Sequence, residues 1–167
     1  HEAGHAILIE LLEHTSPLHK VTIIPRGPSL GSTMWLPEED KHNNRKSELL
    51  DDLVVAMGGR VAEEIQFGDV TNGASGDIRM ASRIARSMVC SWGMSTKLGM
   101  IEYGENESTA FMGRGSSNYS PDTAQKIDEE VKRLIDESYA QAKDILLKHK
   151  DKLDAIAQAL LEYETLD

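Results

Sequence analysis

Apolar residues recur at helical spacing through most of the chain. Over residues 1–13 they join two histidines in a stripe at positions 1, 5, 8 and 12, which follows the 3.6-residue period of an α-helix. The same period, bounded by start and stop signals, predicts four more helices near 47–67, 76–92, 121–150 and 151–163. We therefore expect a mainly α fold.

Small polar residues and glycines mark where these helices begin or bend. Ser75 and Ser120 are placed to cap the helices that follow them, and Pro121 suits a first helical position. The pair Gly58-Gly59 interrupts the apolar period of the second helix. It predicts either a kink or a close approach to another backbone.

Shorter segments carry strand patterns. KVTIIPRG at 20–27 and LGSTMWLPEED at 30–40 are each rich in β-branched or apolar residues and end at proline or glycine. Because only a few residues join them, we expect a hairpin or a small sheet. LGMIEY at 98–103 and AFMG at 110–113 are candidates for two further short strands.

Composition and charge exclude several classes of function. The 167 residues are 40% apolar and 28% charged, which is typical of a soluble globular domain. The net charge is −10 and no basic stripe is present, so we expect no nucleic-acid partner. No apolar run approaches the roughly 20 residues of a membrane-spanning helix, and no secretory signal is found. Cys90 is alone, so no internal disulfide is possible.

The first five residues, HEAGH, carry the strongest chemical signal. His1 and His5 lie four apart on one helical face and can bind a single ion, usually Zn²⁺, through their imidazole nitrogens. Glu2 lies one residue round the helix, where it can take a proton from a water that zinc has acidified to a pKa of about 7. The hydroxide can attack a peptide carbonyl, and Glu2 can pass the proton to the leaving amine. The alternative is two ordinary histidines at this spacing by chance.

A catalytic zinc needs a third protein ligand from elsewhere in the chain. The metzincin pattern would require Gly at position 8 and His at position 11, where this chain has leucines. Three acids compete for the role, namely Glu63, Glu64 and Asp77. The glycine pair blurs the helical period at Glu63 and Glu64, so their position decides nothing.

Asp77 has the best local argument among these acids. It shares a helical stripe with the apolar residues Ala81, Ile84 and Met88, where a carboxylate is costly unless something pairs with it. The alternative is an acid favoured in a first turn by the helix dipole. The residues alone leave both readings open.

Several longer motifs resemble one family. They include HEAGHA, HKVTIIPRG, GGRVAEEI, TNGASGDI and the terminal LLEYETLD. Together they resemble the protease domain of the FtsH-type, membrane-anchored AAA+ zinc metalloproteases over nearly the whole chain. One departure is Gly76, where relatives commonly carry Asn.

The resemblance implies a zinc metalloendopeptidase and a particular site. Zinc, one ion per subunit, is expected at His1, His5 and Asp77, with Glu2 as the catalytic base and Glu63 beside the metal site. A rival enzyme is a stand-alone zinc peptidase, against which the resemblance argues. A rival outside enzymes is a non-catalytic assembly module, against which the intact HExxH argues.

The resemblance also implies the setting of the domain. Family members are homohexamers in which an ATPase ring, using ATP and Mg²⁺, unfolds membrane and soluble proteins and threads them into a protease chamber for quality control. The ring and the membrane anchors precede the protease domain, which faces the bacterial cytoplasm or lies in an organelle. This chain has no P-loop pattern and no initiator Met, and it begins on a motif that needs a helical turn before it. We therefore expect residues 1–167 to be the C-terminal metallopeptidase domain of a longer protein.

The segment LGSTMWLP is the candidate for substrate binding. A peptide can add to an exposed sheet edge as an extra strand, and such backbone pairing tolerates many sequences. With the resemblance, this predicts a substrate-binding edge strand at Thr33, Met34, Trp35 and Leu36. The alternative is an ordinary hairpin strand with Trp35 in the core.

Overall fold

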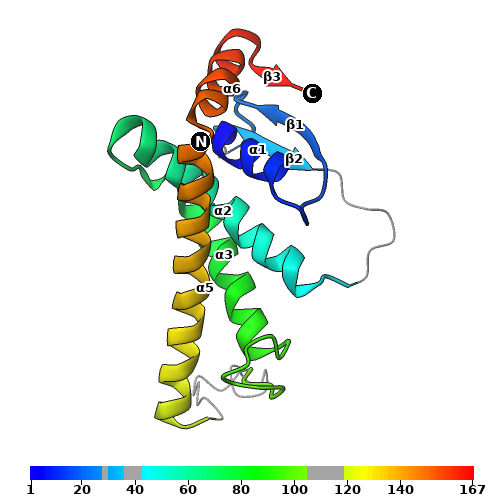
Figure 1. Ribbon diagram of the computed structural model, residues 1–167, viewed down its shortest axis with the longest axis vertical. Helices are drawn as coiled ribbons and strands as arrows, with labels where there is room; N and C mark the ends of the chain where they lie inside the picture. Colours follow the sequence, from blue (N-terminus) through cyan, green and yellow to red (C-terminus); the bar gives the residue numbers. More distant parts are fainter. Residues whose placement is uncertain (28–29, 36–42, 105–118) are drawn as a thin grey trace.

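The computed structural model describes residues 1–27, 30–35, 43–104 and 119–167, and this part of the chain is mainly α, as predicted (Figure 1). Its elements in chain order are α1 (Glu2–Leu11), β1 (Leu18–Thr22), β2 (Ser32–Trp35), α2 (Lys46–Phe67), the 3₁₀ turn η1 (Asn72–Ala74), α3 (Ser75–Cys90), α5 (Pro121–Lys148), α6 (Lys150–Tyr163) and β3 (Thr165–Leu166). No helix among the described residues combines the length and the apolar character that crossing a membrane requires.

The long helix α5 runs beside α2 and α3, while α1, α6 and the small sheet lie together at one end of the molecule (Figure 1). The start of α5 follows the predicted signals. Ser120 is its N-cap and accepts a hydrogen bond from the Thr123 amide, and Pro121 is the first helical residue. Ile127, Leu134 and Leu146 of α5 are buried, so one apolar stripe fixes this helix against the rest of the core.

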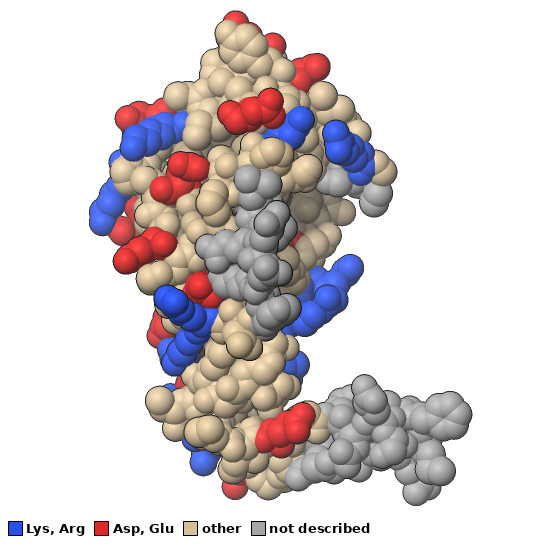
Figure 2. Space-filling model, turned by 90° about the vertical axis from the view of Figure 1, so that its right-hand side faces the viewer, with Lys and Arg blue, Asp and Glu red and all other residues tan. Residues whose placement is uncertain are grey.

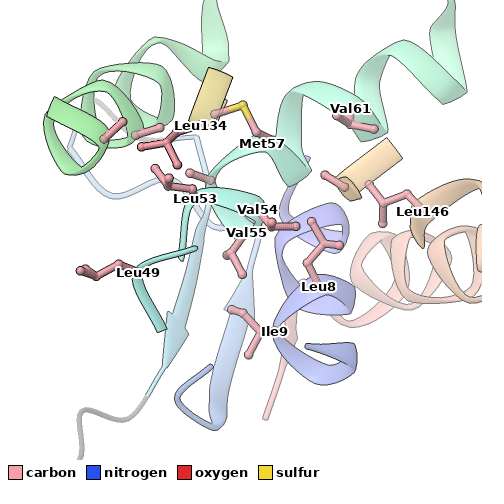
Figure 3. Packing of buried hydrophobic residues seen from close by; sticks show 14 of the residues in the cluster. Leu8, Ile9, Leu49, Leu53, Val54, Val55, Met57, Val61, Leu134 and Leu146 are labelled. Carbon is pink, nitrogen blue, oxygen red and sulfur yellow. The ribbon is translucent and has the colours of Figure 1, made fainter. Parts of the chain in front are cut away.

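The centre of the core is the contact between α1 and α2. Leu8 of α1 and Leu53 and Val61 of α2 are fully buried, and Figure 3 shows Leu8 and Ile9 lying toward the α2 ribbon. The two backbones approach closely at Gly4 and Gly58, where neither residue has a side chain. A Cβ added to Gly4 would lie only 2.3 Å from the Gly58 carbonyl oxygen. Helix α2 continues through Gly58, so the glycine pair serves close packing rather than a break in the helix.

The sheet is antiparallel, with strand order β2-β1-β3. Thr22 of β1 pairs with Ser32 on one side and with Thr165 on the other, so the C-terminal residues cover the far edge of β1. Within the described residues, β2 therefore pairs on one side alone. The predicted strand 30–40 is confirmed at Ser32–Trp35, and its later part lies outside the described residues.

Three local predictions are wrong or untested. Ser75 does not cap α3, because η1 leads directly into the helix and Ala74 is its N-cap. LGMIEY at 98–103 forms no strand, because the chain turns at Gly99, whose φ is +71°, and Tyr103 donates its amide to the Cys90 carbonyl instead. AFMG at 110–113 lies outside the described residues.

Charged side chains of both signs are interspersed over the face shown in Figure 2. Along α5, many pair at i,i+4 spacing, as Lys148 does with Asp144 at 2.8 Å and Arg133 with Glu137 at 2.9 Å. Exposed pairs of this kind contribute only about 0.3–0.5 kcal/mol each. They keep the outer face of the helix soluble and add little to its stability.

One acid on α5 is different because its side chain is 2% exposed. Glu130 accepts hydrogen bonds from Arg133 Nε and Nη2, each at 3.0 Å, and from Ser95 Oγ at 2.7 Å. The Arg133 guanidinium lowers the pKa of Glu130 from 4.5 to about 2, although burial opposes the shift. Glu130 thereby ties the segment after α3 to α5.

We expect Glu130→Gln to remove a pH-dependent part of the stability. Because the folded pKa lies below the unfolded one, this contribution is present above about pH 4.5 and is lost as pH falls toward 2. After allowing for the solvent exposure of Arg133, the stability difference between parent and variant should shrink by about 1 kcal/mol between pH 5 and pH 3. Urea denaturation of both proteins at the two pH values measures it. A constant difference would contradict this account of Glu130.

Candidate metal centre

The two histidines of HEAGH lie at the start of α1, on the side of the helix that faces α2. His1 is the N-cap residue and His5 lies one turn later, 7% exposed. Their rings meet edge to face with centroids 4.9 Å apart. Close packing of Gly4 against Gly58 brings this part of α1 against α2, so the rings lie over the α2 backbone.

Three side-chain atoms converge at this point. His1 Nε2 lies 3.2 Å from His5 Nε2 and 3.2 Å from Asp77 Oδ2, and His5 Nε2 lies 3.5 Å from the same oxygen. Tetrahedral zinc with nitrogen and oxygen ligands at 2.0–2.2 Å places neighbouring ligand atoms roughly 3.3–3.5 Å apart. The observed separations are therefore those that a zinc ion requires of three of its four ligands.

The outer nitrogens of both rings are also engaged. His5 Nδ1 donates to the Val55 carbonyl at 2.7 Å, and His1 Nδ1 lies 2.8 Å from Glu63 Oε1. A carbonyl and a carboxylate both accept, so each Nδ1 carries a hydrogen, and a ring that gives up the proton on Nε2 can offer a metal ion the lone pair of that nitrogen. Either a proton on His1 Nε2 or a metal cation bound by both Nε2 atoms can offset the charge of the Asp77 carboxylate that faces them.

The electrostatics of the site favour positive charge. The Asp77 carboxylate raises the pKa of His1 to about 9. Burial of the ring lowers this pKa, and the contact with Glu63 raises it further. Burial raises the pKa of Asp77, but the hydrogen bonds with His1 and His5 outweigh it and hold that pKa well below the usual range. The residues present fit a divalent metal ion.

Glu63 is held in place by the loop after α2. Its Oε2 accepts hydrogen bonds from the Thr71 amide at 3.1 Å and from Thr71 Oγ1 at 3.2 Å. Burial raises the pKa of Glu63, but the bonds with His1 and Thr71 outweigh this and lower it. Glu63 is thus an ionised residue, 8% exposed, whose carboxylate touches the outer side of the His1 ring.

Glu64, the other acid of that pair, lies apart from the site. Its carboxylate accepts a hydrogen bond from the Tyr139 hydroxyl of α5. Successive residues on a helix point about 100° apart, which explains why Glu63 faces α1 while Glu64 faces α5. Of the three acids that sequence left in competition, Asp77 is the one grouped with the two histidines among the described residues.

Glu2 connects the metal centre to the sheet. Thr33 Oγ1 of β2 lies 2.6 Å from Glu2 Oε2, to which it donates, and 3.2 Å from the Glu2 backbone oxygen. This bond fixes the orientation of the carboxylate and joins the first turn of α1 to the edge strand. Thr33 and Met34 are half-buried, and Leu36 lies outside the described residues.

Two contributors to the site were not predicted from sequence. The Val55 carbonyl and Thr71 act through contacts that depend on how α2 and its following loop pack against α1. No short-range pattern marks them, although Thr71 lies in a loop that the sequence shows as rich in turn residues. Beside His1 is an open hollow of about 400 Å³, lined by Glu63, Phe67, Asp69, Val70 and Thr71.

Comparison with known proteins identifies the family of this chain. The whole chain, residues 1–167, matches the family described as peptidase family M41. It is 62% identical to the ATP-dependent zinc metalloprotease FtsH 2 of Methylacidiphilum infernorum, 56% identical to FtsH of Akkermansia muciniphila and 48% identical to FtsH of Thermotoga maritima. All of this chain is covered in each case, but it spans only 26%, 21% and 28% of those proteins. The resemblance seen in the motifs is confirmed, and the chain belongs to peptidase family M41.

Proposed function

We propose that this chain is the protease portion of an ATP-dependent zinc metalloendopeptidase. The observation that carries the proposal is the convergence of His1 Nε2, His5 Nε2 and Asp77 Oδ2 at separations of 3.2–3.5 Å. The relatives named above are described as ATP-dependent zinc metalloproteases, which supports the same activity. In this proposal, His1, His5 and Asp77 hold zinc, and Glu63 orients His1.

Zinc at these three ligands supplies Lewis-acid chemistry, lowering the pKa of water to about 7. Glu2 then acts as the general base that takes a proton from the water attacking a peptide carbonyl, and it returns that proton to the leaving amine. The Thr33 hydroxyl, 2.6 Å from Glu2 Oε2, holds the carboxylate in one orientation through both transfers. Val55 and Glu63 hold the imidazole rings, so the binding geometry is set before a substrate arrives.

Strand β2 is proposed to bind the substrate backbone. Its partner-free side in the described sheet and its bond to Glu2 through Thr33 support a peptide lying beside the catalytic base. Pairing by main-chain hydrogen bonds explains how one site accepts many sequences. The proposed edge comprises Thr33, Met34, Trp35 and Leu36, of which the first three lie among the described residues.

We expect cleavage to depend on alternate backbone amides of the substrate. A peptide N-methylated at every second amide, away from the scissile bond, should show a KM about tenfold or more higher, because each lost hydrogen bond costs about 0.5–1.5 kcal/mol. The matched control carries methyl groups on the other set, whose amides point away from the edge strand. Methyl groups on the amides that face the edge strand should impair binding, and methyl groups on the amides that point away should not. Equal KM values for both peptides and the unmethylated parent would contradict edge-strand binding.

The full-length protein is proposed to couple this domain to an ATPase. An upstream AAA+ ring using ATP and Mg²⁺ would unfold polypeptides, and a membrane anchor would hold the assembly with the protease domain on the cytoplasmic side or in an organelle. A homohexamer would enclose the cleavage sites, degrading membrane and soluble proteins in quality control. The −10 charge of this chain gives no reason to add a nucleic-acid partner.

Metal content and casein cleavage test the function together. We expect about one zinc per chain, and cleavage of unfolded casein that a chelator abolishes and added zinc restores. A chain extended upstream through the ATPase should also degrade a tightly folded substrate when ATP is supplied. Bound zinc without any casein cleavage in either chain would favour a non-catalytic module. Degradation of the folded substrate by the short chain alone would favour a stand-alone peptidase.

A further inference from the structure

Three positions on one face of α2 contact the two histidines. They are Val55, Gly59 and Glu63, spaced four residues apart and therefore stacked along one side of the helix. Val55 contributes its carbonyl to His5, and Glu63 contributes its carboxylate to His1. Gly59, between them, has no side chain, and the His1 ring lies over the place where its Cβ would be.

The space over Gly59 is filled by that ring. A Cβ built on Gly59 would lie 2.4 Å from His1 Cε1, 2.5 Å from His1 Nε2 and 2.6 Å from His1 Nδ1. Carbon atoms in ordinary contact are about 3.5–4.0 Å apart. Any side chain at position 59 would therefore occupy the place of the imidazole.

We propose that Gly59 is a positioning residue for the metal centre, because its missing side chain lets His1 reach its ligand position. The inference rests on the proposed function, in which His1 holds zinc. It assigns a role to Gly59 that neither the HExxH motif nor the acids beside it describe.

Rotation of the ring cannot relieve the overlap. Three ring atoms lie at nearly the same distance from the added carbon, so the ring presents its face and must move away as a whole by about 1 Å. Glu63 lies on the same side of α2, so this movement lengthens the 2.8 Å contact between His1 Nδ1 and Glu63 Oε1. It also changes the 3.2 Å separations of His1 Nε2 from His5 and Asp77, on which metal binding depends.

The neighbouring glycine has a different role. A Cβ on Gly58 would meet the Leu8 Cδ1 atom at 2.8 Å and the Gly4 backbone at 2.9 Å, which are parts of the packed core. Overlap with a backbone has no cheap relief, whereas the His1 side chain can swing aside. An added methyl should therefore damage folding at position 58 and metal binding at position 59.

The test compares three glycine-to-alanine variants of the chain. Zinc affinity is measured by competition with a chromophoric chelator, and the denaturation midpoint is measured on metal-free protein. Gly59→Ala should bind zinc about 10–100-fold more weakly, with its midpoint unchanged or higher because alanine favours the helix. Gly58→Ala should lower the midpoint. Gly76→Ala, the matched control beside Asp77 with nothing within 4 Å of its added carbon, should leave zinc affinity unchanged.

A double variant resolves the case in which Gly59→Ala folds poorly. His1→Ala removes the ring, so Gly59→Ala should cost no stability in that background; a persisting cost would place the clash elsewhere and overturn the inference. Zinc affinity of Gly59→Ala within threefold of the parent would also overturn it, while leaving the proposed function intact if His5→Ala abolishes binding. A parent chain that binds no zinc would overturn both.

Discussion

Glu2→Gln is expected to bind zinc as tightly as the parent and to lose at least 10²–10⁴-fold in peptide hydrolysis, about the size of a general-base contribution. The amide has nearly the shape of the carboxylate and still accepts the Thr33 hydroxyl bond, so the first turn of α1 keeps its contacts. What it lacks is the ability to take a proton. Zinc content by metal analysis and initial rates on an unfolded substrate measure the two properties separately.

The matched control is Glu10→Gln, on the same helix but exposed to solvent. It makes the same chemical change without touching the site, and both zinc content and rate should equal those of the parent. A zinc-loaded Glu2→Gln variant that retains near-normal turnover would contradict the role assigned to Glu2. Loss of zinc from that variant would show that Glu2 supports metal binding instead.

Asp77→Ala is expected to lose zinc more completely than any other acid-to-alanine variant. Its Oδ2 lies 3.2 and 3.5 Å from the two imidazole Nε2 atoms, so removing it leaves two protein ligands. Glu63→Ala leaves all three proposed ligands in place but removes the bond to His1 Nδ1 and those to Thr71, and it should weaken zinc binding about 10–100-fold. Glu64→Ala, whose partner is Tyr139, should bind zinc normally.

A control variant at a first-turn acid of another helix distinguishes metal binding by Asp77 from a simple interaction of Asp77 with the helix dipole. Asp122 lies in the first turn of α5, as Asp77 does in α3, but it is exposed. If Asp77 served only the dipole, Asp77→Ala and Asp122→Ala would have similar small effects, about 0.3–1 kcal/mol on stability and none on zinc. A zinc-free Glu63 variant beside a zinc-replete Asp77 variant would reverse the ligand assignment.

The short-range part of the site could be predicted from the sequence. His1, Glu2 and His5 lie within two helical turns, so spacing alone places the histidines on one face. The third proposed ligand could not be identified from spacing, because Asp77 approaches the two histidines only through the packing of α3 against α2. Local patterns left ligation and the helix dipole equally plausible, and the family resemblance decided between them. The ligand roles themselves remain predictions for the variants above.

The helices were predicted well because their apolar stripes repeat over several turns. Strand β3 was not predicted, since two residues carry no period and Thr165 pairs with Thr22 far away in the chain. LGMIEY was wrongly predicted as a strand because its apolar residues suit one, although Met100 is 94% exposed and no partner strand pairs with it in the described part of the chain. The Gly58-Gly59 pair is consistent with either a kink or close backbone packing. The structure shows close packing, because α1 lies directly against α2 at these residues.

Anomalous X-ray diffraction at the zinc absorption edge, from crystals of the zinc-loaded chain, tests the proposed zinc ligands most directly. It locates the metal without reference to any proposed ligand. We expect one strong peak about 2.0–2.2 Å from His1 Nε2, His5 Nε2 and the Asp77 carboxylate, with Glu63 contacting His1 and not the ion. A peak bound by Glu63 or Glu64 in place of Asp77, or no peak near the histidines in crystals of active protein, would contradict this ligand assignment.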